Sequence, residues 1–169
     1  RHLKRVFGKV HVNFGEPLVL ADFLEQHRPG WAQQSLSNPA DWSREATFGA
    51  ASELARRLNS AAVVNPVTLV ALTLLSTPRH AADEQVLYRQ LEHCQALLAE
   101  VPYAPETVPC PLDARQIVAY VERLGFAERL AHPLGDLIRV KEGEAPLLAY
   151  FRNNILHIFA LPALIACLL

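Results

Sequence analysis

The segment over residues 66–76 constrains this chain most, because it is apolar on nearly every side. Pro66 suits the first turn of a helix, where no backbone N–H is needed. The next nine residues, VTLVALTLL, would place apolar side chains all round that helix. A helix of this kind is stable when other elements surround it. We therefore expect it at the centre of a mostly α-helical fold.

Other segments carry the spacing of helices with one apolar face. In residues 44–62, for example, apolar residues recur at steps of three and four residues: Phe48, Ala51, Leu54, Ala55 and Leu58. Asp113 can cap a helix that Gly125 would end. The four prolines of residues 102–111 exclude a helix and a central strand there. We expect helices at residues 20–27, 44–62, 66–76, 83–101, 113–124 and 147–169, and a short late strand at residues 137–140.

Apolar and polar residues alternate over residues 6–14, as in the run Val10, His11, Val12. A period of two indicates a half-buried strand. Pro17 would stop it, because proline cannot donate to a sheet ladder. A single strand is not stable without partners. We therefore expect an edge or orphan strand whose partners lie in another part of the protein.

The last predicted helix, residues 147–169, holds the longest apolar run and should be kinked at Pro162. The run from residue 155 onward is shorter than the roughly 20 apolar residues of a transmembrane helix. It fits either a buried core helix, which we favour, or a helix lying at a membrane surface. We expect the first half to pack on residues 66–76, and the end beyond Pro162 to contact lipid or another part of the protein.

The composition excludes several classes of protein. The 169 residues are 51% apolar and 20% charged, which is enough for one sizeable core and unlike a disordered segment. A net charge of −1 with no basic patch argues against a nucleic-acid partner. Three widely spaced cysteines without a ligand pair predict structural thiols in a reducing compartment and no metal site. The lack of any methionine, the start at Arg1 and the apolar end suggest part of a longer protein.

Several segments resemble motifs of one enzyme family. Residues 8–17, GKVHVNFGEP, are similar to the strand and turn near the end of the glycerolipid acyltransferase domain. Residues 59–66, NSAAVVNP, and residues 101–103, VPY, resemble stretches of the long bacterial glycerol-3-phosphate acyltransferases. Residues 150–157, YFRNNILH, followed by LPAL at 161–164, resemble a motif near their C-terminal region. The chain is therefore similar to the C-terminal portion of a bacterial membrane-associated glycerol-3-phosphate acyltransferase.

This resemblance implies a reaction, a place and a domain plan. An acyl group would move from acyl-carrier protein or coenzyme A to the sn-1 hydroxyl of glycerol 3-phosphate, in phospholipid synthesis on the cytoplasmic side of the inner membrane. No cofactor is implied. Residues 1–24 would be the end of the α/β acyltransferase domain, with its last strand, and residues 25–169 a helical C-terminal region. The expected fold class is thus mostly α, with one N-terminal strand and one short late strand.

The catalytic motif of that family is missing from this sequence. Its general base is a histidine in an H-x4-D motif, in which the aspartate orients the imidazole. No histidine here has an aspartate five residues on, and the nearest pair is His11 and Glu16. We therefore assign no catalytic residue and expect the chain alone to be inactive. The alternative is a free-standing helical interaction module, which would follow if the full-length transcript began at or near Arg1. An upstream H-x4-D motif would support the acyltransferase instead.

The densest polar cluster is Arg152, Asn153, Asn154 and His157. On one helix, Asn153 and His157 would share a face because they are four residues apart. Buried amide and guanidinium groups are costly unless they are paired. The cluster can therefore be a polar network that holds the last helix in place, which we favour. It can also be a substrate-binding set that lines an acyl or phosphate pocket.

Overall fold

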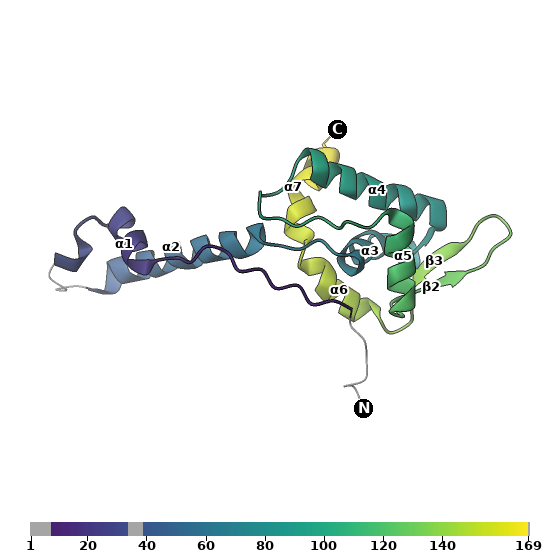
Figure 1. The fold of residues 1–169 in the computed structure, drawn as a ribbon, viewed down its shortest axis with the longest axis horizontal. Coiled ribbons are helices and arrows are strands. Elements are labelled where there is room, and N and C mark those ends of the chain that lie inside the picture. Colours follow the sequence, from purple (N-terminus) through teal and green to yellow (C-terminus); the bar gives the residue numbers. More distant parts are fainter. Residues whose placement is uncertain (1–7, 34–38, 169) are drawn as a thin grey trace, which may run out of the picture. The chain divides into compact units, whose positions relative to one another are not determined.

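The computed structural model describes residues 8–33 and 39–168, without the side chains of residues 39–41. The chain divides into two compact units (Figure 1). Of the described residues, the larger unit contains 8–11 and 62–168, and the smaller contains those within Val12–Ala61.

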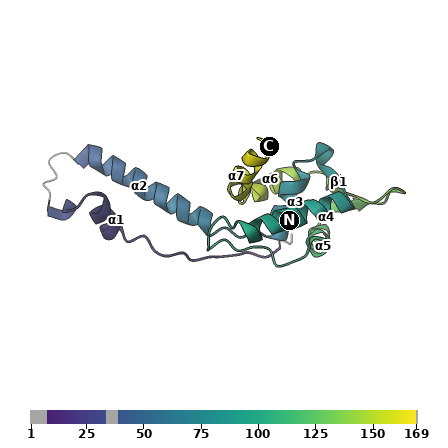
Figure 2. The same ribbon diagram turned by 90° about the horizontal axis from the view of Figure 1, so that it is seen from above.

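The helix predicted from the apolar segment forms the centre of the larger unit (Figures 1 and 2). This helix, α3 (Pro66–Leu74), packs against α4 (Glu84–Glu100), α5 (Ala114–Arg123) and α6 (Ala145–Asn153). Its start is fixed by a capping box in which Asn65 and Thr68 exchange side-chain and backbone hydrogen bonds. Four of its apolar side chains have no exposed surface: Leu69, Val70, Ala71 and Leu74. The predicted central position is confirmed.

A small antiparallel sheet closes one side of this core. Its strands are β1 (Ala81–Asp83), β2 (Ala127–Leu130) and β3 (Leu137–Val140), in the order β1-β3-β2. A 3-10 turn, Pro78–His80, leads into β1. The predicted late strand is confirmed as β3, and β1 and β2 were not predicted. The fold is mostly α, as expected.

The last predicted helix is two helices. α6 ends at Asn153, and α7 (Leu156–Ala166) follows at an angle of 84°. The break lies at residues 154–155, and Pro162 lies inside α7, so the predicted position of the bend was wrong. Ile155 leaves helical geometry, and its side chain is completely buried. The chain turns where this side chain enters the core.

The packing predicted for the first half of the final segment is confirmed, and contact of its end with lipid or another part of the protein stays a prediction. α6 lies against α3, with Leu148 fully buried, and α7 buries Ile158 and Phe159. Beyond Phe159 the apolar side chains of α7 are exposed, including Leu161 and Leu164. Among the described residues, no single helix has both the length and the hydropathy to cross a bilayer. The α6–α7 pair passes that test only when its two bent parts are counted together.

The predicted N-terminal strand is not formed in the described residues. Residues 8–19 have no regular secondary structure, and residues 6 and 7 of the predicted strand lie outside the described part. Val10 is 88% exposed and Phe14 is 95% exposed. The alternating pattern has no neighbouring strand to pair with in this part of the chain, which explains why it does not become a strand.

The smaller unit is a pair of helices, α1 (Leu20–His27) and α2 (Pro39–Ser60), with a 3-10 turn at Trp31–Gln33. The bounds predicted for α1 are confirmed, whereas α2 begins earlier and ends slightly sooner than predicted. α1 packs on α2 through Phe23, close to Gly49, where an added Cβ would lie 3.2 Å from the Phe23 ring. The predicted apolar face of α2 is exposed, with Phe48 and Leu58 each about three-quarters exposed.

Candidate functional site

The four residues singled out in the sequence lie at the bend between α6 and α7. Arg152 and Asn153 form one pair, in which the guanidinium donates to Asn153 Oδ1 at 3.2 and 3.4 Å. Asn154 caps the end of α6 with its backbone N–H. His157, in the first turn of α7, makes an edge contact with the Tyr103 ring, whose centroid is 5.0 Å from its own.

The structure does not bring these side chains into one shared pocket. Asn153 and His157 belong to different helices, so the expectation that they share a helix face was wrong. None of the four residues lines either of the two cavities described below. The Arg152–Asn153 contact lies within α6, and the contact of His157 with Tyr103 joins α7 to the loop that carries Tyr103. The structural network and substrate binding by this cluster both stay predictions.

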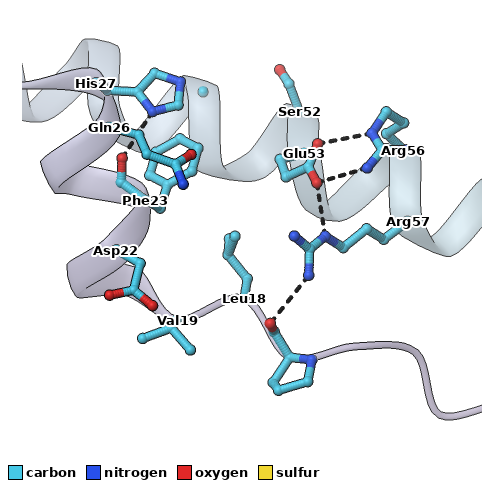
Figure 3. A pocket seen from close by; sticks show the side chains of 12 residues that line it. Leu18, Val19, Asp22, Phe23, Gln26, His27, Ser52, Glu53, Arg56 and Arg57 are labelled. Atoms are coloured by element: carbon cyan, nitrogen blue, oxygen red, sulfur yellow. Dashed lines mark hydrogen bonds and ion pairs between the residues drawn. The ribbon is translucent and has the colours of Figure 1, made fainter.

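A polar pocket of about 590 Å³ lies between α1 and α2 of the smaller unit (Figure 3). Asp22, Gln26 and His27 line it from α1, and Glu53 with two arginines from α2. The His27 ring stacks on Phe23 at a centroid distance of 4.0 Å, and its Nδ1 lies 2.8 Å from the Phe23 carbonyl oxygen. These contacts fix the α1 wall of the pocket.

The arginines of this pocket are already engaged. Arg56 donates to both carboxylate oxygens of Glu53 at 2.8 Å, and Arg57 donates to Oε1 of the same carboxylate at 2.7 Å (Figure 3). Hydrogen bonds from Arg56 and then Arg57 lower the pKa of Glu53 from its ordinary value of 4.5 to about 2. Arg57 also donates to the carbonyl oxygens of Glu16 and Pro17. Arg57 therefore ties the preceding segment to α2, and both guanidinium groups already donate to one carboxylate.

The larger unit contains a second cavity, of about 400 Å³, whose walls are mainly apolar. Its walls come from segments that are far apart in the sequence. These are the start of α3, the loop of residues 102–112 (the proline-rich loop), α5 and α6. Tyr120 and Phe151 supply the aromatic side chains, and Lys9 and His11 lie at its edge. The remaining lining residues are Val63, Val64, Asn65, Pro66, Val67, Val108, Pro109, Cys110, Pro111 and Leu112.

Hydrogen bonds hold the walls of this apolar cavity in place. Val64 donates its N–H to the Val108 carbonyl at 2.9 Å, and the Val108 N–H donates to Ala62 at 3.0 Å. Gln95 Nε2 donates to the carbonyl of Leu112 at 2.8 Å. The proline-rich loop is thus fixed to the start of α3 and to α4, although it has no helix of its own. A cavity with fixed walls is typical of a small-molecule site, for which about 300–1,000 Å³ is usual.

Within residues 8–33 and 39–168, the structure adds no catalytic constellation to the sequence. No group of three or more His, Cys, Asp or Glu side chains lies in metal-binding geometry among the described residues. Burial raises the pKa of the Cys110 and Cys94 thiols, which is the opposite of what a nucleophilic cysteine needs. The sequence analysis did not predict the apolar cavity. Pro66, Pro109 and Pro111 line it, but only the structure shows that these prolines face one space.

Comparison with known proteins agrees with the resemblance found in the motifs. Two proteins named glycerol-3-phosphate acyltransferase, from Pseudomonas putida GB-1 and Pseudomonas fluorescens SBW25, are 46% and 47% identical to this chain. Each alignment covers 97% of this chain and 20% of the relative's length. The protein of that name from Xanthomonas axonopodis pv. citri is 43% identical to this chain, over 98% of this chain and 19% of the relative's length. The chain thus spans about a fifth of the length of these relatives. No solved structure matches it.

The family model described as the glycerol-3-phosphate acyltransferase C-terminal region matches residues 1–169. This match covers every segment that carried the resemblance, from the GKVHVNFGEP stretch to the LPAL sequence in α7. The chain belongs to the glycerol-3-phosphate acyltransferase C-terminal region family.

Proposed function

We propose that this chain is the C-terminal region of an enzyme that transfers an acyl group to the sn-1 hydroxyl of glycerol 3-phosphate, forming lysophosphatidate. The donor would be acyl-carrier protein or coenzyme A carrying the acyl group. The observation that carries the proposal is the family match over residues 1–169, together with relatives of that name that are about five times as long. The same proposal assigns residues 1–24 to the end of the acyltransferase domain.

Within such an enzyme this region would act as a scaffold. It has no H-x4-D motif, and both arginines of its polar pocket are already hydrogen-bonded to Glu53. Its larger unit, by contrast, is a well-packed core around α3 with uncovered apolar surface on α7. These features suit a part that supports the acyltransferase domain and its place at the membrane, and do not suit the acyl-transfer step itself.

The test is acyl transfer by the longer protein that contains this chain. Purified protein is incubated with acyl-coenzyme A and labelled glycerol 3-phosphate, and labelled lysophosphatidate is measured. We expect product from the unchanged protein and from Leu134→Asp, since Leu134 is 90% exposed. Leu148→Asp, which puts a charge into the core, should abolish product formation. If the unchanged protein transfers no acyl group to glycerol 3-phosphate, the proposed reaction is wrong.

We also propose that the end of α7 rests on the cytoplasmic face of the inner membrane. Leu161, Leu164, Ile165 and Leu168 are all more than half exposed. No Asp, Glu, Lys or Arg occurs between Asn153 and Leu169. Leaving such side chains in water is unfavourable, since full burial of each is worth roughly 1.5–3 kcal/mol. The charge of Arg152, just before the bend, suits a surface position better than the bilayer centre.

Membrane contact is tested with vesicles that contain anionic lipid. Co-sedimentation of the longer protein is compared for Leu168→Asp and for Leu134→Asp, which changes an exposed leucine outside α7. We expect Leu168→Asp to weaken sedimentation without changing thermal unfolding, while Leu134→Asp leaves both unchanged. Loss of folding in Leu168→Asp with unchanged vesicle binding of the folded protein would contradict the membrane proposal.

A further inference from the structure

The apolar cavity of the larger unit has a basic edge that nothing in the described residues neutralises. Lys9 and His11 line the cavity at this edge, and both residues are exposed. Within the described ranges, neither side chain has a hydrogen bond or an ion pair, and no Asp or Glu lines the cavity. This differs from the polar pocket, where Glu53 engages both arginines.

The segment that carries this edge is placed by a close contact. Gly8 has a φ of +93°, and a Cβ at this position would lie 3.0 Å from the Tyr120 hydroxyl oxygen and 3.2 Å from Leu124 Cδ1. Glycine is the residue that takes this backbone conformation at low cost and permits such an approach. The backbone next to Lys9 therefore lies against α5, whose Tyr120 forms part of the cavity wall.

We propose that this cavity binds the acyl chain of lysophosphatidate, with Lys9 and His11 contacting the phosphate. The choice of this ligand rests on the proposed function, of which lysophosphatidate is the product. The apolar walls require a hydrocarbon chain, and the unpaired basic edge requires an anion close to the end of that chain.

Other molecules of the same reaction meet these requirements less well. Glycerol 3-phosphate has the anion but no chain to fill the apolar part. In an acyl donor, the long pantetheine arm separates the thioester from the nearest phosphate, so the anion would lie far beyond the edge. A volume of about 400 Å³ lies near the lower end of the usual range for ligand sites, which suits one chain better than two.

Binding is tested on the whole 169-residue chain with a lysophosphatidate of medium chain length, below its micelle concentration. Calorimetry measures the affinity, and backbone amide shifts show where the ligand lies. We expect saturable binding, with shifts at Val67 and Cys110. Lys9→Glu should weaken binding about tenfold or more, because it replaces a charge-assisted contact by repulsion. Lys141→Glu, an equal charge change on an exposed lysine outside the cavity, should leave affinity unchanged.

Two matched ligands test the role of the phosphate. The monoacylglycerol of the same chain length lacks the anion, and the fatty carboxylate has the anion without glycerol phosphate. We expect both to bind at least about tenfold more weakly than lysophosphatidate. Equal affinity for monoacylglycerol would overturn the role of Lys9 and His11. Equal affinity for the carboxylate would overturn the assignment to lysophosphatidate.

A steric variant tests the cavity itself. Val63 lines the cavity and is only partly buried, so Val63→Trp should narrow it and abolish binding. Leu134→Trp is the control for an added indole outside the cavity. If Val63→Trp unfolds the chain, Leu112→Phe takes its place, because Leu112 also lines the cavity. A folded cavity variant that still binds with unchanged affinity overturns the site.

The binding test and the activity test fail separately. If the chain does not bind lysophosphatidate while the longer protein produces it, this inference is wrong and the proposed function stands. If the longer protein produces no lysophosphatidate, the proposed function is wrong, and the assignment of the product as ligand is overturned with it.

Discussion

The packing of α6 on α3 predicts how stability depends on the final segment. Leu148 lies in α6 and has no exposed surface, so Leu148→Ala leaves a cavity at the centre of the larger unit. Buried leucine-to-alanine changes cost about 2–5 kcal/mol, and the upper half of that range applies where neighbours cannot collapse into the space. Leu69 and Leu74 of α3, which face the same core, are themselves fully buried. We therefore expect a loss of about 3–5 kcal/mol.

The assay is equilibrium unfolding in urea, followed by circular dichroism, on the 169-residue chain. Leu164→Ala is the matched control, because Leu164 is also a helical leucine but is 64% exposed on α7. It should change the free energy of unfolding by less than about 0.5 kcal/mol. The reasoning is refuted if the two substitutions cost the same, because the outer face of α7 would then be packed in the folded chain.

Three further predictions concern the remaining elements. Arg129 donates to Glu84, Glu122 and Asp136, so Arg129→Met should cost about 1–2 kcal/mol in a urea titration, the network being partly exposed. Gly125 has a φ of +76°, so Gly125→Ala should lower the thermal midpoint, which differential scanning calorimetry measures. Hydrogen bonds from Tyr88 and then Arg129 lower the pKa of Glu84 below 4.5 in the folded chain. The ionised Glu84 therefore contributes its full stabilisation of the fold above pH 4.5, and this contribution is lost as the pH falls through the lowered pKa. Glu84→Gln should therefore flatten the acid side of the stability profile, and an unchanged acid slope would contradict this.

The parts of the fold that sequence patterns predicted are those that local interactions decide. α1 begins and ends at the predicted residues, and the predicted cap at Asp113 is formed. The late strand was also predicted at the right residues, and its Ile138 and Val140 are buried in the core. α3 was placed at the centre because its apolar residues leave no face for solvent.

The parts that sequence patterns missed depend on contacts between distant segments. β1 and β2 are only three and four residues long, and both exist as strands because each pairs with β3. The bend after Asn154 follows from the burial of Ile155, whereas Pro162 was the local signal. Residues 8–14 show the reverse case, in which a strand pattern finds no partner among the described residues.

The candidate site was less accessible to sequence reasoning than the fold. The cluster at Arg152 was visible as a run of polar residues, but the bend that separates Asn153 from His157 was not. The apolar cavity combines Lys9 with Tyr120 and Phe151, which are more than 100 residues away from it in the sequence. No period or motif reports such a combination, because it is created by the packing of the helices.

We propose that this chain is part of an acyltransferase and that other residues of the longer protein perform the acyl transfer. The most direct measurement incubates the purified 169-residue chain with acyl-coenzyme A and labelled glycerol 3-phosphate, beside the longer protein that contains it. We predict that the longer protein forms labelled lysophosphatidate and that the chain alone forms none above the blank, because no histidine in it has an aspartate five residues on. Turnover by the isolated chain would contradict the account.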